Sequence, residues 1–346
     1  MVNDIENTKM RTDVFVINRF KAAHLIFENL ANLGLFNAVY YIDIVSESEK
    51  IEAGQKPFLI FKNDNGFSLF VGYSDRNVMC GYNQVFIGDA MPFGLLLCYK
   101  NGNANVFAYD DGLPMYKGNF LTDQSGGFYG LVKRVLKIRE FSVRPLKYYV
   151  NCRDLCHSTV AKEIMQLPKW VKGNKAIEFS ERLFMYKKRN AKGNRKIVFL
   201  EQPMHEMDGY TGRSISSFIK NLGIEDECIV RLHPRSCQSY DNLVTDTGDN
   251  NWELECINVI SDGDILMGCY SMSLFSPKII ADKEPYVIFL FDVLLETLNE
   301  NKRRTMVKTI KEFEGIYRSK DKVLIAASEA DLVSILKDLR VVRGNW

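Results

Sequence analysis

Short apolar runs rich in β-branched residues alternate with segments of helical periodicity along most of this chain. The first run, Val14–Ile17, precedes a helical pattern through Ala22–Leu33, which Gly34 is placed to end. The same alternation restarts with the run at 196–200 and a helical segment near 214–221. Short β-branched runs favour strands, whereas apolar spacing of three and four residues favours helices. The alternation predicts an α/β fold, with parallel strands covered by helices on both faces.

Further strands are expected wherever similar runs recur. In the first half these are residues 39–44, 58–61, 68–71, 95–99, 104–109 and 147–150. In the second half they are residues 228–232, 264–270, 279–281 and 322–326, with amphipathic helices around 287–298 and 332–339.

The length of 346 residues indicates two domains, because single hydrophobic cores stop growing at roughly 250–300 residues. A basic run at 187–196, KKRNAKGNRK, reads as an exposed linker between them, although an anion site or contact with an anionic membrane surface stays open. We therefore divide the chain into domains at 1–185 and 186–346. Two α/β halves joined by a linker are the outline of a GT-B enzyme with two Rossmann-like domains, whose ligands would bind at the carboxyl ends of strands.

Charge and cysteine usage exclude several other classes. The net charge of +2 gives no general reason to expect a nucleic-acid partner. The eight cysteines form no Cys-x-x-Cys pair, so reduced thiols are expected in place of a disulfide framework or a zinc site. The first residues are polar, and no apolar stretch approaches the roughly 18–20 residues of a membrane span. A cytoplasmic protein is expected.

Two adjacent carboxylates, Asp110 and Asp111, follow the apolar run NVFAY and precede Gly112. Adjacent carboxylates repel, which can raise the pKa of one and leave the other ionised as a base. Asp-Gly is also a common turn dipeptide, so the sequence alone leaves a simple turn open.

A second polar segment, Arg231-Leu232-His233-Pro234-Arg235, lies at the end of the β-rich run ECIVRL. Pro234 biases His233 toward an extended conformation, and the two arginines carry donors suited to phosphate. A histidine here could donate a proton to a departing phosphate oxygen. A structural histidine at a strand end is the alternative.

Two serines, Ser271 and Ser273, follow the run DILMGCY. Hydroxyls at a strand-to-helix turn can form a phosphate cradle, and simple N-capping is the alternative. Just before that run, Asp262-Gly263-Asp264 matches the Asp-x-Asp motif of metal-dependent transferases, but its position favours a turn.

In their order along the chain, these three segments resemble the motifs of the bacterial sialyltransferases: an acidic pair with glycine, a His-Pro, and a serine pair. The nearest likeness is to glycosyltransferase family 52, the lipooligosaccharide sialyltransferase group. Similarity extends to residues 200–203, LEQP, and to Trp252-Glu253. Two departures stand out: the serine pair reads Ser271-Met272-Ser273, and residues 18–21, NRFK, replace the usual Thr-Pro and Gln.

The resemblance implies an inverting, metal-independent transfer of sialic acid from CMP-sialic acid to a bacterial surface glycan, with no cofactor beyond this donor. Domain 1–185 would be the acceptor side and domain 186–346 the donor side. The catalytic residues would be Asp111 as general base, Asp110 as its neighbour or substitute, and His233 at the leaving phosphate. The implied donor-binding residues are Gly112, Gln202, Arg231, Pro234, Arg235, Glu253, Ser271 and Ser273.

Other possibilities stay open at this point. The altered serine motif is compatible with a GT-B transferase for another nucleotide sugar, and a non-catalytic nucleotide- or glycan-binding relative is a third reading. Peripheral contact with the inner membrane and a homodimer are neither required nor excluded. The acceptor and the linkage are not specified by the sequence.

Overall fold

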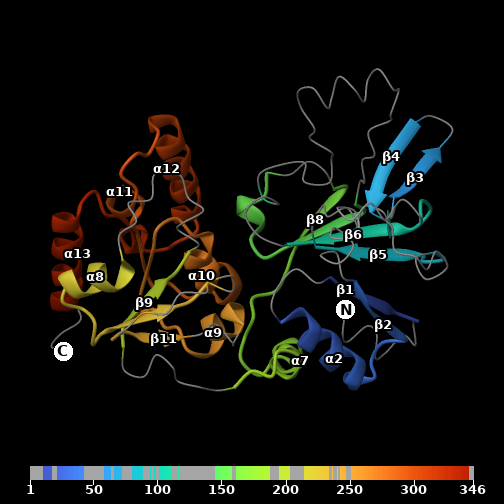
Figure 1. Cartoon of the computed structure of the whole chain (residues 1–346), viewed down its shortest axis with the longest axis horizontal. Helices are drawn as coiled ribbons and strands as arrows, with labels where there is room; N and C mark the ends of the chain where they lie inside the picture. The colour runs from blue at the N-terminus through green and yellow to red at the C-terminus, as the bar shows by residue number, and fades with distance from the viewer. Residues whose placement is uncertain are drawn as a thin grey trace. The chain divides into compact units, whose positions relative to one another are not determined.

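The chain forms two compact units in a computed structural model (Figure 1). Unit 1 comprises Met1–Val14, Phe20–Val39 and Lys169–Trp346, and unit 2 comprises Phe15–Arg19 and Tyr40–Pro168. The structure describes residues 11–17, 22–42, 58–63, 66–71, 80–88, 94, 97–98, 101–110, 116, 145–157, 161–187, 195–202, 214–233, 236, 240, 242–246 and 251–342.

Unit 1 is built on a six-stranded sheet in the order β11-β10-β9-β12-β13-β14. Its strands are β9 (Ile197–Leu200), β10 (Cys228–Arg231), β11 (Val244–Asp246), β12 (Ile265–Gly268), β13 (Tyr286–Phe289) and β14 (Val323–Ile325). All five pairings are parallel. Counted by their order along the chain, the strands lie as 3-2-1-4-5-6, which is the doubly wound Rossmann order.

The central strands are apolar and fully buried, since helices cover both faces of a doubly wound sheet. Every residue of β9, β10 and β12 is buried, including Phe199 and Met267, which pair in register. Burial on both faces explains why these strands read as continuous apolar runs and show no alternation.

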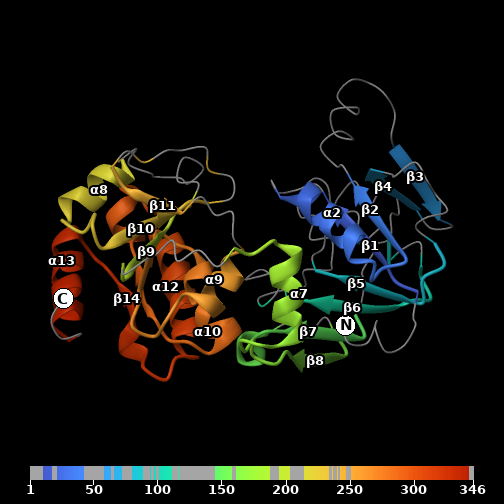
Figure 2. The same cartoon turned by 90° about the horizontal axis from the view of Figure 1, so that it is seen from below.

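Helices lie on both sides of the sheet of unit 1, with α8 and α13 on one side and α9 and α10 on the other (Figures 1 and 2). The unit's helices are α2 (Ala23–Leu33), α7 (Lys175–Leu183), α8 (Ile215–Asn221), α9 (Trp252–Asn258), η3 (Met272–Phe275), α10 (Ser276–Ala281), α11 (Phe291–Leu294), α12 (Glu300–Glu314), η4 (Lys320–Lys322) and α13 (Glu329–Val342). A small core of Ile177, Leu254, Ile257 and Ile280 joins α7, α9 and α10.

Unit 2 holds a second parallel sheet, in the order β5-β6-β7-β8. Its elements are β3 (Phe58–Asn63), β4 (Gly66–Val71), β5 (Gln84–Ile87), β6 (Asn105–Tyr109), β7 (Lys147–Val150), η1 (Arg153–Leu155) and β8 (Glu163–Gln166). Strands β3 and β4 pair as an antiparallel hairpin. Strands β1 (Asp13–Ile17) and β2 (Ala38–Ile42) form a two-stranded sheet, and the division between the units passes through both of them.

The α/β class with parallel sheets is confirmed, and several local predictions are too. Gly34 ends α2 in the left-handed conformation with φ 64°. Three predictions are wrong. Residues 279–281, predicted as a strand, belong to helix α10. Residues 287–289, predicted as the start of a helix, lie in strand β13. Leu97 and Cys98, within the strand predicted at 95–99, are helical. Each error falls on a short apolar run, where periodicity alone cannot separate a buried helix from a buried strand.

The two units divide at a different place from the two domains inferred from sequence. The chain enters the long segment of unit 1 at Lys169, before α7, whereas the predicted linker follows α7. Unit 1 also contains α2, from near the start of the chain. The functional division into acceptor-side and donor-side domains stays a prediction.

Candidate functional site

The predicted donor residues of unit 1 gather at one end of its sheet. Strands β10, β9 and β12 are neighbours and run parallel, so the segments that follow them leave the sheet at the same edge. Those segments begin with Leu232-His233 after β10, Glu201-Gln202 after β9, and Cys269-Tyr270-Ser271 after β12. The strand order reverses between β9 and β12, and ligands of doubly wound sheets bind outside the carboxyl ends at such a point.

Gln202 joins the two segments at this switch point. Its Nε2 donates to the backbone oxygen of Tyr270 at 2.8 Å, and its Oε1 accepts from the backbone N–H of Tyr270 at 2.6 Å. One side-chain amide thus satisfies both polar backbone groups of the residue before Ser271. One N–H of Nε2 and one lone pair of Oε1 remain for a ligand, because an amide has two donors and two acceptor positions.

Glu201 makes the corresponding connection on the other side of β9. Its Oε2 accepts from the backbone N–H of His233 at 2.9 Å. Its Oε1 accepts from the hydroxyls of Ser236, at 2.8 Å, and Tyr240, at 2.6 Å. Glu201 is buried, and it was given no role from the sequence. The available signal was an acidic residue directly after a wholly apolar strand.

Arg231 is the last residue of β10, and its guanidinium is committed within the protein. It is buried, its Nη1 pairs with Oδ2 of Asp246 at the end of β11, and its Cζ lies 5.1 Å from the centre of the Trp252 ring. The predicted contact with a donor phosphate would have to compete with these partners. The structure instead connects Arg231 to the start of α9, where Glu253 lies in the first turn.

The serine segment shows the capping geometry that the sequence left open. Ser271 is the N-cap of η3, and its Oγ accepts from the N–H of Ser273 at 3.3 Å. The backbone oxygen of Ser273 accepts from Nε1 of Trp252 at 2.9 Å, which ties this segment to α9. Ser273 is exposed and Ser271 partly so.

Asp110 directly follows β6 in unit 2, and its carboxylate is held by hydrogen bonds. Its Oδ2 accepts from the hydroxyl of Tyr116, from the backbone N–H of Asn151 at 3.2 Å and from Nδ2 of Asn151 at 3.0 Å. The Tyr116 hydroxyl accepts in turn from the N–H of Cys152 at 3.2 Å. Burial, and then the neighbouring charge of Asp110, raise the pKa of Tyr116 well above its usual value, so this hydroxyl stays a donor. Asp110 is thus an anchored carboxylate.

Four of the residues predicted from sequence lie outside the described residues. They are Asp111, Gly112, Pro234 and Arg235.

The Asp-x-Asp segment is a turn at the opposite end of the sheet. Asp264 is completely buried and its Oδ2 accepts from the N–H and Oγ of Ser261, at 2.7 and 2.9 Å. Oδ1 of Asp262 accepts from the N–H of Glu284 at 2.7 Å. Both residues precede β12, whereas the site segments follow the strands. In the part of the chain that the structure describes, no group of three or more His, Cys, Asp and Glu side chains is arranged to hold a metal ion.

A search of the described helices for one long and apolar enough to cross a membrane finds none.

The fold and the site define a doubly wound α/β unit with a connected polar site at its switch point. Neither a comparison with models of protein families nor one with curated proteins finds a match. Among solved structures, the wall teichoic acid polymerase TagF is similar with a TM-score of 0.44 and 13% identity, over 98% of this chain and 82% of that one. A second TagF structure, with CDPG, is similar with a TM-score of 0.39 and 13% identity, over 99% of this chain and 94% of that one. A co-structure of S. aureus MnaA with UDP is similar with a TM-score of 0.35 and 11% identity, over 96% of this chain and 97% of that one. These likenesses are too weak to assign a function, so the residues of this chain must carry it.

Proposed function

We propose that this chain is an inverting glycosyltransferase that uses a nucleotide sugar, and that its donor is CMP-sialic acid. The observation that supports it best is the switch point between β9 and β12. There, the segments carrying Gln202, His233 and Ser271 leave the sheet at one edge. Glu201 accepts a hydrogen bond from the N–H of His233, and Gln202 donates one to the backbone oxygen of Tyr270, so the segments are joined. Such an edge suits the phosphate and nucleoside of a sugar nucleotide. The choice of a cytidine donor rests on the order of the sequence motifs, which resembles that of the bacterial sialyltransferases.

In the proposed reaction an acceptor hydroxyl attacks the anomeric carbon of sialic acid while the bond from that carbon to the CMP phosphate oxygen breaks. Asp111 takes the hydroxyl proton, and CMP leaves with the bonding electron pair. His233 gives a proton or a hydrogen bond to the departing phosphate oxygen. Ser271, Ser273 and Arg235 are proposed to hold the phosphate as its negative charge grows. Glu253 is proposed to contact the nucleoside. No step requires a metal ion or another cofactor.

The anchored state of Asp110 favours Asp111 as the base. Three hydrogen bonds to Oδ2 fix the orientation of the Asp110 carboxylate. A proton transferred to Oδ2 would compete with these three donors for the lone pairs of that oxygen. Asp110 is therefore proposed as support for the segment that carries Asp111.

The first test is a donor screen combined with exchange of the proposed base. CMP and CDP should raise the melting temperature more than UDP, GDP or ADP, because a ligand at about 100 times its Kd stabilises by roughly 2.7 kcal/mol. Asp111→Asn should lower transfer from CMP-sialic acid by about 10²–10⁴-fold with donor binding retained.

Three outcomes would redirect the proposal. A clear preference for UDP would move the protein to another nucleotide-sugar class, which the Ser271-Met272-Ser273 departure keeps open. Nucleotide binding without transfer or donor hydrolysis would indicate a binding protein. Near wild-type transfer by folded Asp111→Asn, Asp110→Asn and His233→Ala variants would refute the catalytic roles.

A further inference from the structure

Three of the residues that follow β10 donate hydrogen bonds to one buried carboxylate, which directly follows the central strand β9. Glu201 accepts three hydrogen bonds, from the backbone N–H of His233 and from the hydroxyls of Ser236 and Tyr240. These donors span eight residues of sequence, from 233 to 240, so a single side chain fixes both ends of that stretch. Glu201 is 7% exposed, which keeps competing water away from these bonds.

The three groups that donate to Glu201 are uncharged. Glu201 therefore forms no ion pair with these groups, in contrast to Asp246, which pairs with Arg231. The backbone N–H of His233 is the most informative of the three, because it fixes the main chain at the residue whose imidazole is proposed to meet the leaving phosphate. Glu201 therefore holds the backbone at His233 and leaves the ring nitrogens of the imidazole out of this contact.

We propose that Glu201 is a positioning residue for the leaving-group site: it holds the backbone of His233, together with the side chains of Ser236 and Tyr240, so that the His233 imidazole is presented to the donor phosphate. This inference rests on the proposed function for its catalytic meaning, while the positioning itself is a property of the fold. Glu201 acts through His233 and takes no proton during the reaction.

The hydrogen-bond chemistry separates two substitutions of similar size. In Glu201→Gln the amide oxygen can still accept from the N–H of His233, and its NH2 group can turn toward the hydroxyls of Ser236 and Tyr240, which are able to accept. In Glu201→Leu no acceptor remains at this position, and the hydrogen bond from the N–H of His233 is lost. We expect Glu201→Gln to behave much like the wild type, and Glu201→Leu to lose the attachment of His233, Ser236 and Tyr240 to residue 201.

The first measurement is hydrogen exchange, which does not depend on the reaction. Peptides that cover residues 232–240 should exchange at least about 10-fold faster in Glu201→Leu than in the wild type, with Glu201→Gln close to the wild type. Tyr240→Phe, which removes one hydroxyl and keeps the ring, should fall between them. Glu296→Gln, an exposed glutamate of the same unit, serves as the control and should change nothing.

The second measurement is a double-mutant cycle on kcat for transfer from CMP-sialic acid. Glu201→Leu should lower kcat by about 10- to 100-fold in the wild-type background, and by much less in a His233→Ala background, where the positioned group is already gone. A merely structural role would give the same fold-change in both backgrounds.

The two measurements distinguish failure of this inference from failure of the proposed function. Unchanged exchange at 232–240 in Glu201→Leu, or equal kcat losses in both backgrounds, would overturn the positioning role while leaving the transferase intact. Faster exchange in a protein that transfers no sugar would retain the structural attachment and reject the proposed function, and with it the role at the leaving group.

Discussion

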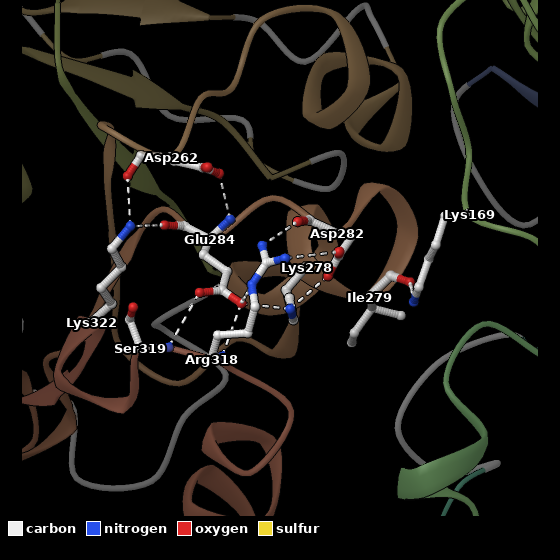
Figure 3. A network of polar contacts seen from close by, with 9 residues as sticks. All are labelled: Lys169, Asp262, Lys278, Ile279, Asp282, Glu284, Arg318, Ser319 and Lys322. Carbon is white, nitrogen blue, oxygen red and sulfur yellow. Dashed lines mark hydrogen bonds and ion pairs between the residues drawn. The ribbon is translucent and has the colours of Figure 1, made fainter.

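The two ends of the six-stranded sheet both bury a glutamate, but they surround it with different chemistry. At the carboxyl end, Glu201 accepts from one backbone N–H and two hydroxyls. At the amino end, Glu284 precedes β13 and is bound by two cations, Nζ of Lys278 at 2.6 Å and Nε of Arg318 at 3.0 Å (Figure 3).

The amino-end network closes the sheet. Lys278 is itself buried and also reaches Oδ1 of Asp282 at 2.6 Å, while Lys322 donates to the backbone oxygens of Glu284 and Asp262 (Figure 3). These contacts tie together the segments that enter β12, β13 and β14. The charged groups of this network pair with one another, so the amino end is suited to stability. The carboxyl end, held mainly by uncharged donors, is suited to a ligand.

The largest expected difference between the ends is in acid stability. Burial by itself would raise the pKa of Glu284, but the hydrogen bond from Lys278 and those from the N–H groups of Arg318 and Ser319 outweigh it and lower the pKa from 4.5 to about 2. Between these values the unfolded carboxyl binds a proton and the folded one does not. Stability should therefore be full above pH 4.5 and fall by roughly 3 kcal/mol as the pH drops to about 2.

Glu284→Gln should remove this dependence and lower the free energy of unfolding at pH 7 by about 3–5 kcal/mol, because Lys278 stays buried and keeps only the half-exposed Asp282 as an acidic partner. Denaturant unfolding across the pH range measures both effects. The exposed pair of Glu300 and Arg304 provides the control, since Glu300→Gln should cost no more than about 0.5 kcal/mol. An equal loss in the two variants would contradict the contrast between the buried network and the surface.

Two glycines at opposite ends of β12 offer a smaller and closely matched test. A Cβ at Gly268 would lie 3.1 Å from the backbone oxygen of Leu200, whereas a Cβ at Gly263 would meet nothing nearer than Oγ of Ser261 at 4.0 Å. Gly268→Ala should therefore destabilise by about 1–3 kcal/mol and weaken nucleotide binding, because it pushes β9 and β12 apart at the switch point. Gly263→Ala should change stability by less than about 1 kcal/mol. Melting curves with and without CMP would show whether the two ends differ in this way.

The smallest expected effect is that of chelation. Asp262 and Asp264 are occupied by the turn at the amino end, and the proposed phosphate contacts are His233, Arg235 and serine hydroxyls. Transfer should therefore survive EDTA. Loss of activity that manganese or magnesium restores would return Asp262 and Asp264 to consideration.

The sequence predicted the carboxyl end better than the amino end. Strand-end positions for Gln202, His233 and Ser271 follow from local pattern, because short apolar runs mark β9, β10 and β12. The roles of Glu201 and Glu284 did not follow, since their partners lie 32 to 39 residues away for Glu201 and as far as 35 residues away for Glu284. Distant pairing of this kind is set by tertiary packing. The pairing of Arg231 with Asp246 could not be predicted either, because no local pattern reveals it.

The errors in the fold have the same origin. The run at 279–281 contains Ile279 and Ile280, and without its neighbours it reads equally as a strand. Pro277 in the first turn of α10, together with the packing of Ile280 against α9, decides for a helix. Unit 1 also includes a helix from near the start of the sequence, α2, and no local pattern indicates that inclusion.

The place of α2 in unit 1 affects how the chain folds during synthesis. Nδ2 of Asn29 in α2 donates to the backbone oxygen of Leu183, at the end of α7, across 154 residues of sequence. As the chain leaves the ribosome, α2 emerges early and must wait for α7, while the whole of residues 40–168 is made in between. Unit 2 can gather most of its contacts while translation continues. Unit 1 reaches its final arrangement only after the later segment has arrived, and closing that long loop makes its last docking step slow compared with the folding of its individual helices.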